Sequence, residues 1–291
     1  MASIDIICPL YNAEKYVVKQ LEQIVKQTQY SDVKNIRYIL TKGTDNTEEI
    51  VNNIKKENDK IVSKTINKEE FSHSLTRENE AMESKADIIV FITQDVIIES
   101  NVWLENLVKP IEDGIVQASF SRQICNDKSS IEYYTRQKNY PSTSLIKSKS
   151  DIEKMGMNTF FYSDASSAID KKVFIKLNGY DEKKLPTNED MYIAYKLINN
   201  GYKIKYCADS EVIHSHKFTL KETFRRYKLY GQFLKQEPEI NVKSTSAGGG
   251  LAKFIIMQAF KDHNARIIFR FLPDMAARYI GMKAGEHDGK Q

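Results

Sequence analysis

Four short polar segments contain most of the residues in this chain that have the chemistry of a catalytic site. They are Cys8-Pro9-Leu10-Tyr11-Asn12, Thr93-Gln94-Asp95, Asn188-Glu189-Asp190 and His214-Ser215-His216. Three of them end or follow apolar runs with the character of strands, and the remaining one opens a predicted helix. Polar and acidic side chains at strand ends are typical of the site in an open α/β sheet.

Asp95, His214 and His216 are the candidates for a metal site. A carboxylate at the end of a central strand can hold Mg²⁺ or Mn²⁺ against a diphosphate, because the phosphates supply other ligands. The two histidines alternate after a strand, so both imidazoles are expected on one face. A turn-capping aspartate and a pair of surface histidines explain the same residues with about equal weight.

Glu189 and Asp190 are the candidates for catalysis. A carboxylate that faces a sugar hydroxyl can act as its general base. Acidic residues are also common in the first turn of a helix, where capping and the helix dipole favour them, and this interpretation carries more weight for the segment taken alone. The same dipole is expected to lower the pKa of Asp190, which keeps it ionised but weakens it as a base.

Two further segments have residue types suited to a nucleotide. Thr41 and Gly43 lie in a turn after a predicted strand, where they are placed either to line a base pocket or to form an ordinary turn with Gly43 at positive φ. His73 and Arg77 lie at the start of a predicted helix, where phosphate can bind. Local sequence alone favours the structural interpretation of both segments, a plain turn and a solvated helix face.

The elements that must position these residues follow an alternating pattern. Strands are predicted at residues 4–8, 36–40 and 88–93, with helices at 14–27, 47–61 and 74–85 between them. This order indicates a parallel sheet with right-handed crossovers. Later strands are predicted at 116–123, 165–170, 203–207 and 211–213, and helices at 171–178, 190–199, 218–235 and 251–282.

The domain organisation follows from composition. Residues 126–150 are polar and are predicted as a mobile excursion outside the core. A core domain is expected at residues 1–236 and a basic helical extension at 237–291. Three widely spaced cysteines argue against a disulfide framework or zinc site. No signal peptide or membrane-spanning stretch is visible, so a cytoplasmic protein is expected.

The charge of the chain is uneven. The net charge is +4, yet residues 214–283 hold 13 Lys/Arg and 5 Asp/Glu. This basic third predicts an anionic partner, nucleic acid or an anionic membrane surface. Basic residues alternate with apolar ones at helical spacing, as suits a helix lying among lipid headgroups at the inner face of the membrane; packing on the core or in a homodimer carries equal weight. No RNA-binding motif or helix-turn-helix accompanies them, so nucleic acid is not expected.

The order of motifs resembles family 2 glycosyltransferases of the GT-A fold and, within them, bacterial rhamnosyltransferases. The resemblance covers about residues 4 to 285. It rests on Pro9-Leu10-Tyr11-Asn12, the 41–45 turn, Phe71-x-His73 with Arg77, Thr93-Gln94-Asp95, Arg122-Gln123, Asn139-Tyr140-Pro141, Gly179-Tyr180, Glu189-Asp190 and Val212-Ile213-His214-Ser215-His216. The chain departs from the family pattern where Thr41 replaces an acidic residue, Ser74 replaces a glycine and Glu78 follows Arg77.

This resemblance implies a GT-A-like, mostly parallel α/β sheet flanked by helices, and an inverting transfer of L-rhamnose from dTDP-β-L-rhamnose. The implied acceptor is a saccharide or lipid-linked saccharide of cell-surface polysaccharide synthesis. Asp190 is the implied base with Glu189 beside it, and Asp95 with His214 or His216 holds Mg²⁺ or Mn²⁺. The implied donor contacts are Pro9, Tyr11, Asn12, Thr41, Gly43, His73, Arg77, Gln94, Asp95 and Arg122. A UDP-hexose transferase and a non-catalytic module that binds anionic polymers are the alternatives.

Overall fold

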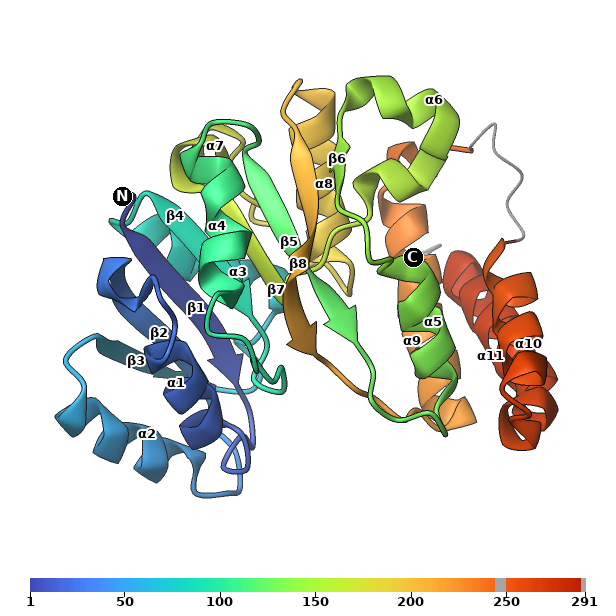
Figure 1. Ribbon diagram of the computed structural model, residues 1–291, viewed down its shortest axis with the longest axis horizontal. Coiled ribbons are helices and arrows are strands. Elements are labelled where there is room, and N and C mark those ends of the chain that lie inside the picture. Colours follow the sequence, from blue (N-terminus) through green and yellow to red (C-terminus); the bar gives the residue numbers. More distant parts are fainter. Residues whose placement is uncertain (244–249, 289–291) are drawn as a thin grey trace.

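The computed structural model describes residues 1–243 and 250–288. Within these residues one eight-stranded sheet has the order β3-β2-β1-β4-β7-β5-β8-β6 (Figure 1). The strands are β1 Ile4–Leu10, β2 Val33–Thr41, β3 Ile61–Ile66, β4 Ile88–Ile92, β5 Ala118–Ile124, β6 Leu145–Lys147, β7 Ser166–Asp170 and β8 Ile204–Ile213. The helices are α1 Val17–Val25, α2 Thr47–Glu57, α3 His73–Glu83, α4 Trp103–Glu112, α5 Ile131–Asn139, α6 Ile152–Met155, α7 Lys171–Lys176, α8 Glu189–Asn199, α9 Leu220–Gln236, α10 Gly250–Lys261 and α11 Ala265–Asp288.

The sheet is mixed but mostly parallel, as the resemblance implied. Strands β3, β2, β1 and β4 pair in parallel, and β5 pairs in parallel with β8. Strand β7 runs antiparallel between β4 and β5, and β6 is an antiparallel edge strand on β8. Parallel neighbours joined by helices direct their carboxyl ends to one edge, where the segments after β1, β2 and β4 emerge.

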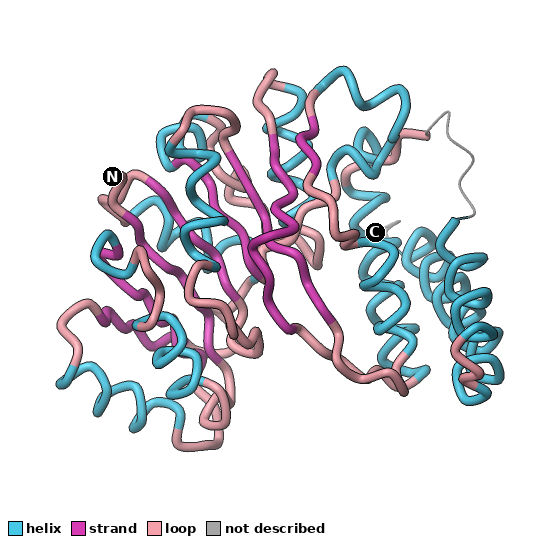
Figure 2. Tube along the Cα trace, viewed as in Figure 1, coloured by secondary structure: helices cyan, strands magenta, loops and turns pink. Residues whose placement is uncertain are grey.

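Helices cover both faces of the sheet (Figure 2), and successive strand residues face two separate apolar layers. Ile4, Ile6 and Cys8 of β1 face the layer that contains α1, α2 and α4, whereas Ile7 faces the layer that contains α3, α7 and α8. Both faces are therefore covered, which explains why β1 and β4 are almost continuous apolar runs in the sequence.

Two predicted segments are corrected by the structure. The helix predicted over residues 47–61 ends at Glu57, and the missed strand β3 follows at Ile61–Ile66. This strand is polar because it lies at the edge of the sheet, where its Ser, Lys and Thr side chains contact water. Helix α4 was also missed, although Trp103 on it is fully buried.

The prediction of a mobile excursion over residues 126–150 is wrong. Helix α5 and strand β6 lie in this segment, and Tyr134 and Tyr140 are buried. Although the segment is polar in composition, its aromatic rings supply apolar contacts. Tyr134 packs in a small apolar cluster with Ile255 and Ala259 of α10. Residues 203–213, predicted as two strands, form the single strand β8 with an irregular register opposite Ser121 and Arg122.

The C-terminal helices α10 and α11 lie at one end of the molecule, beside α5 and α9 (Figure 1). Helix α11 packs closely along α9 because glycines remove side chains from the contact. A Cβ at Gly281 would lie 2.4 Å from the carbonyl oxygen of Phe224, and one at Gly285 only 1.9 Å from that of Lys228. No helix in the described ranges is long and apolar enough to cross a bilayer.

Candidate active site

The ends of β1, β2 and β4 are tied together by side-chain to backbone hydrogen bonds. The Tyr11 amide donates to Gln94 Oε1 at 2.7 Å, and Gln94 Nε2 donates to the Tyr11 carbonyl at 3.0 Å. Asn12, at a φ of 48°, accepts a bond from the Thr44 amide. The predicted Tyr11, Asn12 and Gln94 are therefore one structural unit at this edge.

Gly43 and Thr41 lie beside this unit. A Cβ at Gly43 would lie 2.1 Å from Asn12 Oδ1, so a larger residue there would displace the Asn12 side chain, and Gly43 does not have the positive φ expected for an ordinary turn. The Thr41 hydroxyl is buried and finds no hydrogen-bond partner in the described residues. An unsatisfied buried hydroxyl is uncommon, and a bound ligand group can supply the missing hydrogen-bond partner.

Asp95, His214 and His216 come together as predicted. The candidate ligand atoms of the three side chains all lie within 4.8 Å of one another. His214 Nε2 lies 3.5 Å from Asp95 Oδ1, and His216 Nε2 lies 3.7 Å from Asp95 Oδ2. An isolated antiparallel β-bridge between Ile97 and Ile213 brings the segment after β4 next to the end of β8. In the sheet itself, β7 and β5 lie between β4 and β8.

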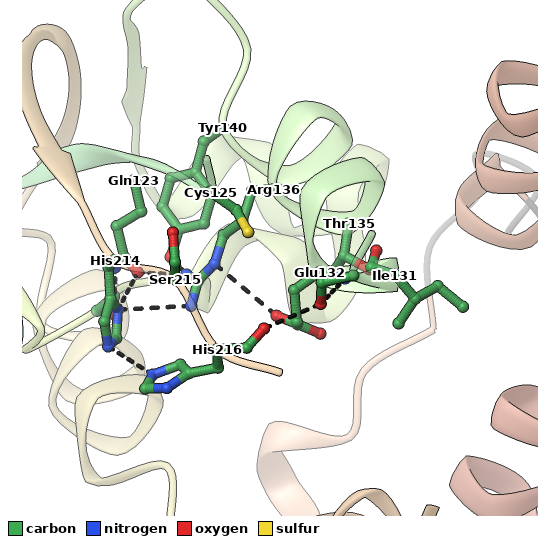
Figure 3. Close-up of polar contacts among 12 residues, drawn as sticks. Gln123, Cys125, Ile131, Glu132, Thr135, Arg136, Tyr140, His214, Ser215 and His216 are labelled. Carbon is green, nitrogen blue, oxygen red and sulfur yellow. Dashed lines mark hydrogen bonds and ion pairs between the residues drawn. The ribbon is translucent and has the colours of Figure 1, made fainter. Parts of the chain in front are cut away.

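His214 is oriented by hydrogen bonds behind it (Figure 3). Its Nδ1 lies 2.9 Å from Gln123 Oε1, which also accepts a bond from Arg136 Nη1. An oxygen acceptor places the proton on Nδ1, which leaves Nε2 free to accept. That nitrogen lies 2.7 Å from Nε2 of His216, so the two imidazoles face each other at the position where a shared ligand would bind.

The electrostatics of this triad favour an ionised Asp95 and a neutral His216. Burial tends to raise the pKa of Asp95, but the hydrogen bond and charge of His214 and the charge of His216 lower it well below its usual value. Burial and the neighbouring His214 lower the pKa of His216 to about 4. An anionic oxygen and two imidazoles are a donor set that suits a divalent transition metal such as Mn²⁺.

A second cluster surrounds Arg77, which is 2% exposed. Its Nη1 donates to Glu189 Oε1 at 2.9 Å and to the His73 carbonyl at 3.1 Å. Nearby, Asp164 accepts hydrogen bonds from the hydroxyls of Ser167 and Tyr180, each at 2.7 Å. Asp164 was missed because it lies in an irregular segment before β7 and resembles an ordinary turn residue in the sequence.

Asp190 stands beside this cluster, and its predicted pKa shift has the wrong sign. Burial raises the pKa of Asp190 well above its ordinary value, and the carboxylates of Glu189 and Asp164 raise it further. The helix start contributes only a bond from the Met191 amide, and with Arg77 this opposes the rise without reversing it. A carboxyl with a raised pKa is a stronger base than the sequence indicated.

The two clusters share electrostatic neighbours. Burial lowers the pKa of both His73 and His216, and the Arg226 guanidinium contributes to each shift. Arg226 lies 4.3 Å over the ring of Phe218, which stacks on His216. No hydrogen-bond or ion-pair partner of Arg226 is found within residues 1–243 and 250–288. The sequence did not single out this cation, because its stacking depends on how α9 follows the His216 segment.

Arg122 lies apart from the other predicted donor contacts. Its Nη1 pairs with Glu211 at 3.1 Å and its Nε donates to the Tyr140 carbonyl at 3.3 Å. Its neighbour Gln123 instead reaches His214. Pro9 lies in β1 and supports the strand end, and the His73 ring contacts Phe71 edge to face.

Comparison with known proteins settles the family. The model of glycosyl transferase family 2 matches residues 5–177. The chain belongs to glycosyltransferase family 2. It is therefore a glycosyltransferase, and the motifs at the strand ends lie on the scaffold of that family.

Two curated relatives are similar over most of the chain. The O-antigen chain rhamnosyltransferase RfbN of Salmonella typhimurium is 35% identical over 98% of this chain and 90% of its own length. The O-antigen chain rhamnosyltransferase WbaN of Salmonella anatum is 36% identical over 71% of this chain and 66% of its own.

Solved structures share the fold. A mannosyltransferase of Pyrobaculum calidifontis, in complex with GDP-Man and Mn²⁺, has a TM-score of 0.61 at 14% identity and covers 98% of this chain and 76% of its own. TarS residues 1–349 of S. aureus, in complex with UDP, has a TM-score of 0.57 at 13% identity and covers 99% and 92%. The GT-A architecture is thereby established for this family 2 enzyme.

Proposed function

We propose that this glycosyltransferase transfers L-rhamnose from dTDP-β-L-rhamnose, with inversion, to a saccharide or lipid-linked saccharide acceptor of cell-surface polysaccharide synthesis. The observation that carries the proposal is the 35% identity to a rhamnosyltransferase over 98% of the chain. The Thr93-Gln94-Asp95 segment, which the sequence relates to the rhamnosyltransferase subgroup, lies at the centre of the site and supports it.

The residues present fit a divalent cation, Mg²⁺ or Mn²⁺. Asp95, His214 and His216 would hold it, since one carboxylate and two imidazoles converge there and Gln123 leaves Nε2 of His214 free. When bound, such an ion stabilises the negative charge that gathers on a leaving diphosphate. Arg226 adds a positive charge on the His216 side of this site, where it stacks on Phe218.

The donor would lie across the strand ends. Tyr11, Asn12, Thr41 and Gly43 face the nucleotide in this proposal, and the unpaired Thr41 hydroxyl offers a hydrogen bond to the base. Gln94 holds the β1 end in place through its two bonds to Tyr11. Arg77 acts indirectly, because its guanidinium is bound to Glu189; its proposed role is to fix Glu189 and the helix start that carries Asp190.

Asp190 is the proposed general base. The acceptor hydroxyl oxygen forms a bond to the anomeric carbon while the bond from that carbon to the diphosphate oxygen breaks. The hydroxyl proton passes to Asp190, and the electron pair of the broken bond leaves with the diphosphate. The raised pKa of Asp190 favours this proton transfer, which contributes roughly 10²–10⁴-fold in comparable enzymes.

The C-terminal helices are the proposed contact with an anionic membrane surface, from the cytoplasmic side. On α11, Phe269 is 81% and Leu272 is 74% exposed, and both lie on the same face as the exposed Arg266 and Lys283. An exposed apolar stripe bounded by cations fits anionic headgroups, where a lipid-linked acceptor would also lie. Residues 237–291 would then form a membrane-contacting extension of the 1–236 domain.

The test is a transfer and donor-hydrolysis screen with the full chain. We expect turnover with dTDP-β-L-rhamnose and Mg²⁺ or Mn²⁺, loss of turnover in EDTA, and an α-linked product. Preference for a UDP-hexose would overturn the donor and favour the alternative transferase. Absence of nucleotide binding by thermal shift with every donor, with or without metal, would favour the module that only binds anionic polymers.

A further inference from the structure

A chain of charged groups connects the C-terminal helix α11 to the imidazole of His214. Arg278 of α11 lies 3.5 Å from Glu132 Oε1 on α5. The other oxygen of Glu132 lies 3.9 Å from Arg136 Nε, one turn along the same helix. Arg136 in turn donates to Gln123 Oε1, which accepts from His214 Nδ1, and Arg136 Nη2 also lies 3.5 Å from His214 Nδ1. Figure 3 shows Arg136 between Glu132 and His214, with Gln123 beside His214.

The far end of this chain is anchored in the packing of α9 against α11. Arg278 donates to Asp274 Oδ2 at 2.6 Å and to the Tyr227 hydroxyl at 2.8 Å. Asp274 is 1% exposed and also accepts a long bond, 3.4 Å, from Thr223 of α9. The position of Arg278 is therefore fixed by two helices that contain neither a proposed metal ligand nor the proposed base.

The charged groups that connect α11 to His214 are well shielded from water. The side chains of Glu132, Arg136 and Arg278 are 16%, 15% and 11% exposed. Charges in such surroundings interact more strongly than at an open surface, and removing one partner leaves the other unpaired. Glu132 lies between the guanidiniums of Arg136 and Arg278, so its loss would leave Arg136 without an ion-pair partner among the described residues, whereas Arg278 would keep Asp274.

We propose that α11 positions the metal-ligand candidate His214 through Arg278, Glu132, Arg136 and Gln123. Glu132 attracts the Arg136 guanidinium by charge, since Arg136 Nε makes no hydrogen bond among the described residues. Arg136 donates a hydrogen bond to the Gln123 amide oxygen, and that oxygen fixes the ring and tautomer of His214. The proposal rests on the proposed function, because His214 matters for catalysis only if it binds the cation. Partners behind a ligating histidine commonly control metal affinity.

The experiment measures Mn²⁺ affinity of the full chain by electron paramagnetic resonance, without donor or turnover. We expect Glu132→Gln to raise the Mn²⁺ dissociation constant by about tenfold, the lower end of the effect typical for such partners. Arg278→Gln should act in the same direction. The double variant should bind Mn²⁺ as tightly as Glu132→Gln alone, because both substitutions interrupt the same series of contacts between α11 and His214. Asp95→Ala establishes that the measured ion occupies the proposed site.

Lys228→Gln is the matched control. Lys228 of α9 forms an ion pair with Asp288 of α11, so its loss also weakens the contact between these helices. Among the described residues that pair makes no hydrogen bond or ion pair with Glu132 or His214, and the variant should bind Mn²⁺ like the parent. An equal loss of affinity in Lys228→Gln and Arg278→Gln would overturn the proposal in favour of general loosening of the helices.

A second measurement distinguishes failure of the relay, meaning the contacts from Arg278 through Glu132, Arg136 and Gln123 to His214, from failure of the metal site. In ¹⁵N-histidine NMR spectra without metal, His214 should show the Nδ1–H tautomer in the parent and in Lys228→Gln. The signal should change in Glu132→Gln and Arg278→Gln. If the parent binds no Mn²⁺, the metal proposal fails while the spectra still decide on the relay. Unchanged spectra in both variants would overturn the relay even if Mn²⁺ binds.

Discussion

At the scale of single residues, the site is built from charges that are partly buried and face one another. Three carboxylates, Glu189, Asp190 and Asp164, share one buried guanidinium, Arg77. One cation cannot neutralise three anions in a largely buried cluster, so the carboxyl groups hold their protons more tightly there. Burial raises the pKa of both Asp190 and Asp164, and the neighbouring carboxylate of Glu189 adds to both shifts.

This arrangement predicts that Asp190→Asn trades activity for stability. We expect transfer to fall by roughly two orders of magnitude or more, with donor binding retained, if Asp190 is the base. We also expect the free energy of unfolding at pH 7 to increase. The folded-state pKa of Asp190 lies above its unfolded value, so the folded protein binds the extra proton and loses stability as pH rises through that pKa. The amide removes this loss.

Transfer rates, nucleotide affinity and urea unfolding of the two proteins check this prediction. Near-parental transfer by Asp190→Asn would assign the proton to another group. A lower free energy of unfolding with unchanged activity would instead identify Asp190 as a helix-capping residue, the interpretation that the local sequence favours.

The position of Arg226 predicts that this residue contributes to binding of the diphosphate. Its guanidinium stacks on Phe218 beside His216, and no carboxylate of the described residues lies within ion-pair distance of it. We expect Arg226→Met to weaken nucleoside diphosphate binding by about tenfold, the size of one hydrogen bond to a charged group. Titration calorimetry measures this, and Arg225→Met, an exposed neighbour on the same helix, is the control. Equal affinities of the two variants would remove Arg226 from the donor site.

At the scale of elements, the active edge depends on connections between strand ends rather than on the strands alone. The bridge between Ile97 and Ile213 and the paired bonds between Tyr11 and Gln94 join segments that the sheet order separates or leaves open. The short edge strand β6 contains a buried lysine. Lys147 on it is 2% exposed and bonds to the carbonyl oxygens of Phe161 and Asn158.

This buried amine predicts a pH dependence of stability. Burial lowers the pKa of Lys147 to about 7 from 10.5. Between these values the unfolded chain carries a proton that the folded chain releases, so the free energy of unfolding should rise with pH, by at most about 1.4 kcal/mol per pH unit. Denaturant unfolding at pH 7, 8 and 9 measures the slope.

Lys147→Met should have a smaller slope over the same pH range, because the titrating group is gone. The comparison is made between the two proteins, so that other titrating groups cancel. Parallel lines for the parent and the variant would mean that Lys147 stays protonated in the fold, held by its two carbonyl partners.

At the scale of the whole molecule, an exposed apolar stripe lies on the end opposite to β3 (Figure 1). The structure changes which side chains form it. Of the apolar residues that the sequence predicts for the membrane-facing helices, Phe269 is exposed, whereas Ile255 and Ile267 are fully buried near α5. The other large apolar residues exposed on α10 and α11 are Met257, Phe260, Leu272, Tyr279 and Ile280.

This surface predicts binding to anionic vesicles. We expect the parent to float with anionic liposomes at low salt, to bind less at high salt, and to ignore neutral liposomes. The variant Phe269→Ser/Leu272→Ser should lose binding. Ile115→Ser, at an exposed apolar residue far from α11, should keep it. Retention of the double variant on the vesicles would place the contact elsewhere.

A second copy of the chain is the other occupant of this surface. Size-exclusion chromatography of the parent and the double variant tests for it. A parent dimer that becomes monomeric on Phe269→Ser/Leu272→Ser, with no vesicle binding by either, would assign the stripe to a homodimer instead of the membrane.

The sequence by itself determined the α/β order, the family motifs and the metal-ligand candidates. These features are local: apolar runs mark β1 and β4, and Asp95, His214 and His216 follow strands that a parallel sheet must end at one edge. Edge strand β3 and helix α5 were missed because their stability comes from neighbours. A strand at the sheet edge needs no apolar pattern, and α5 depends on α10, more than a hundred residues later in the chain.

Only the tertiary structure decided the charges of the site. The helix-start pattern predicted a lowered pKa for Asp190, but the fold partly buries it beside the carboxylates of Glu189 and Asp164, which raises its pKa. Asp164 and Arg226 reach the site from segments whose local sequence is ordinary. Electrostatic shifts depend on burial and on distances between residues remote in sequence, and these quantities exist only once the chain has folded.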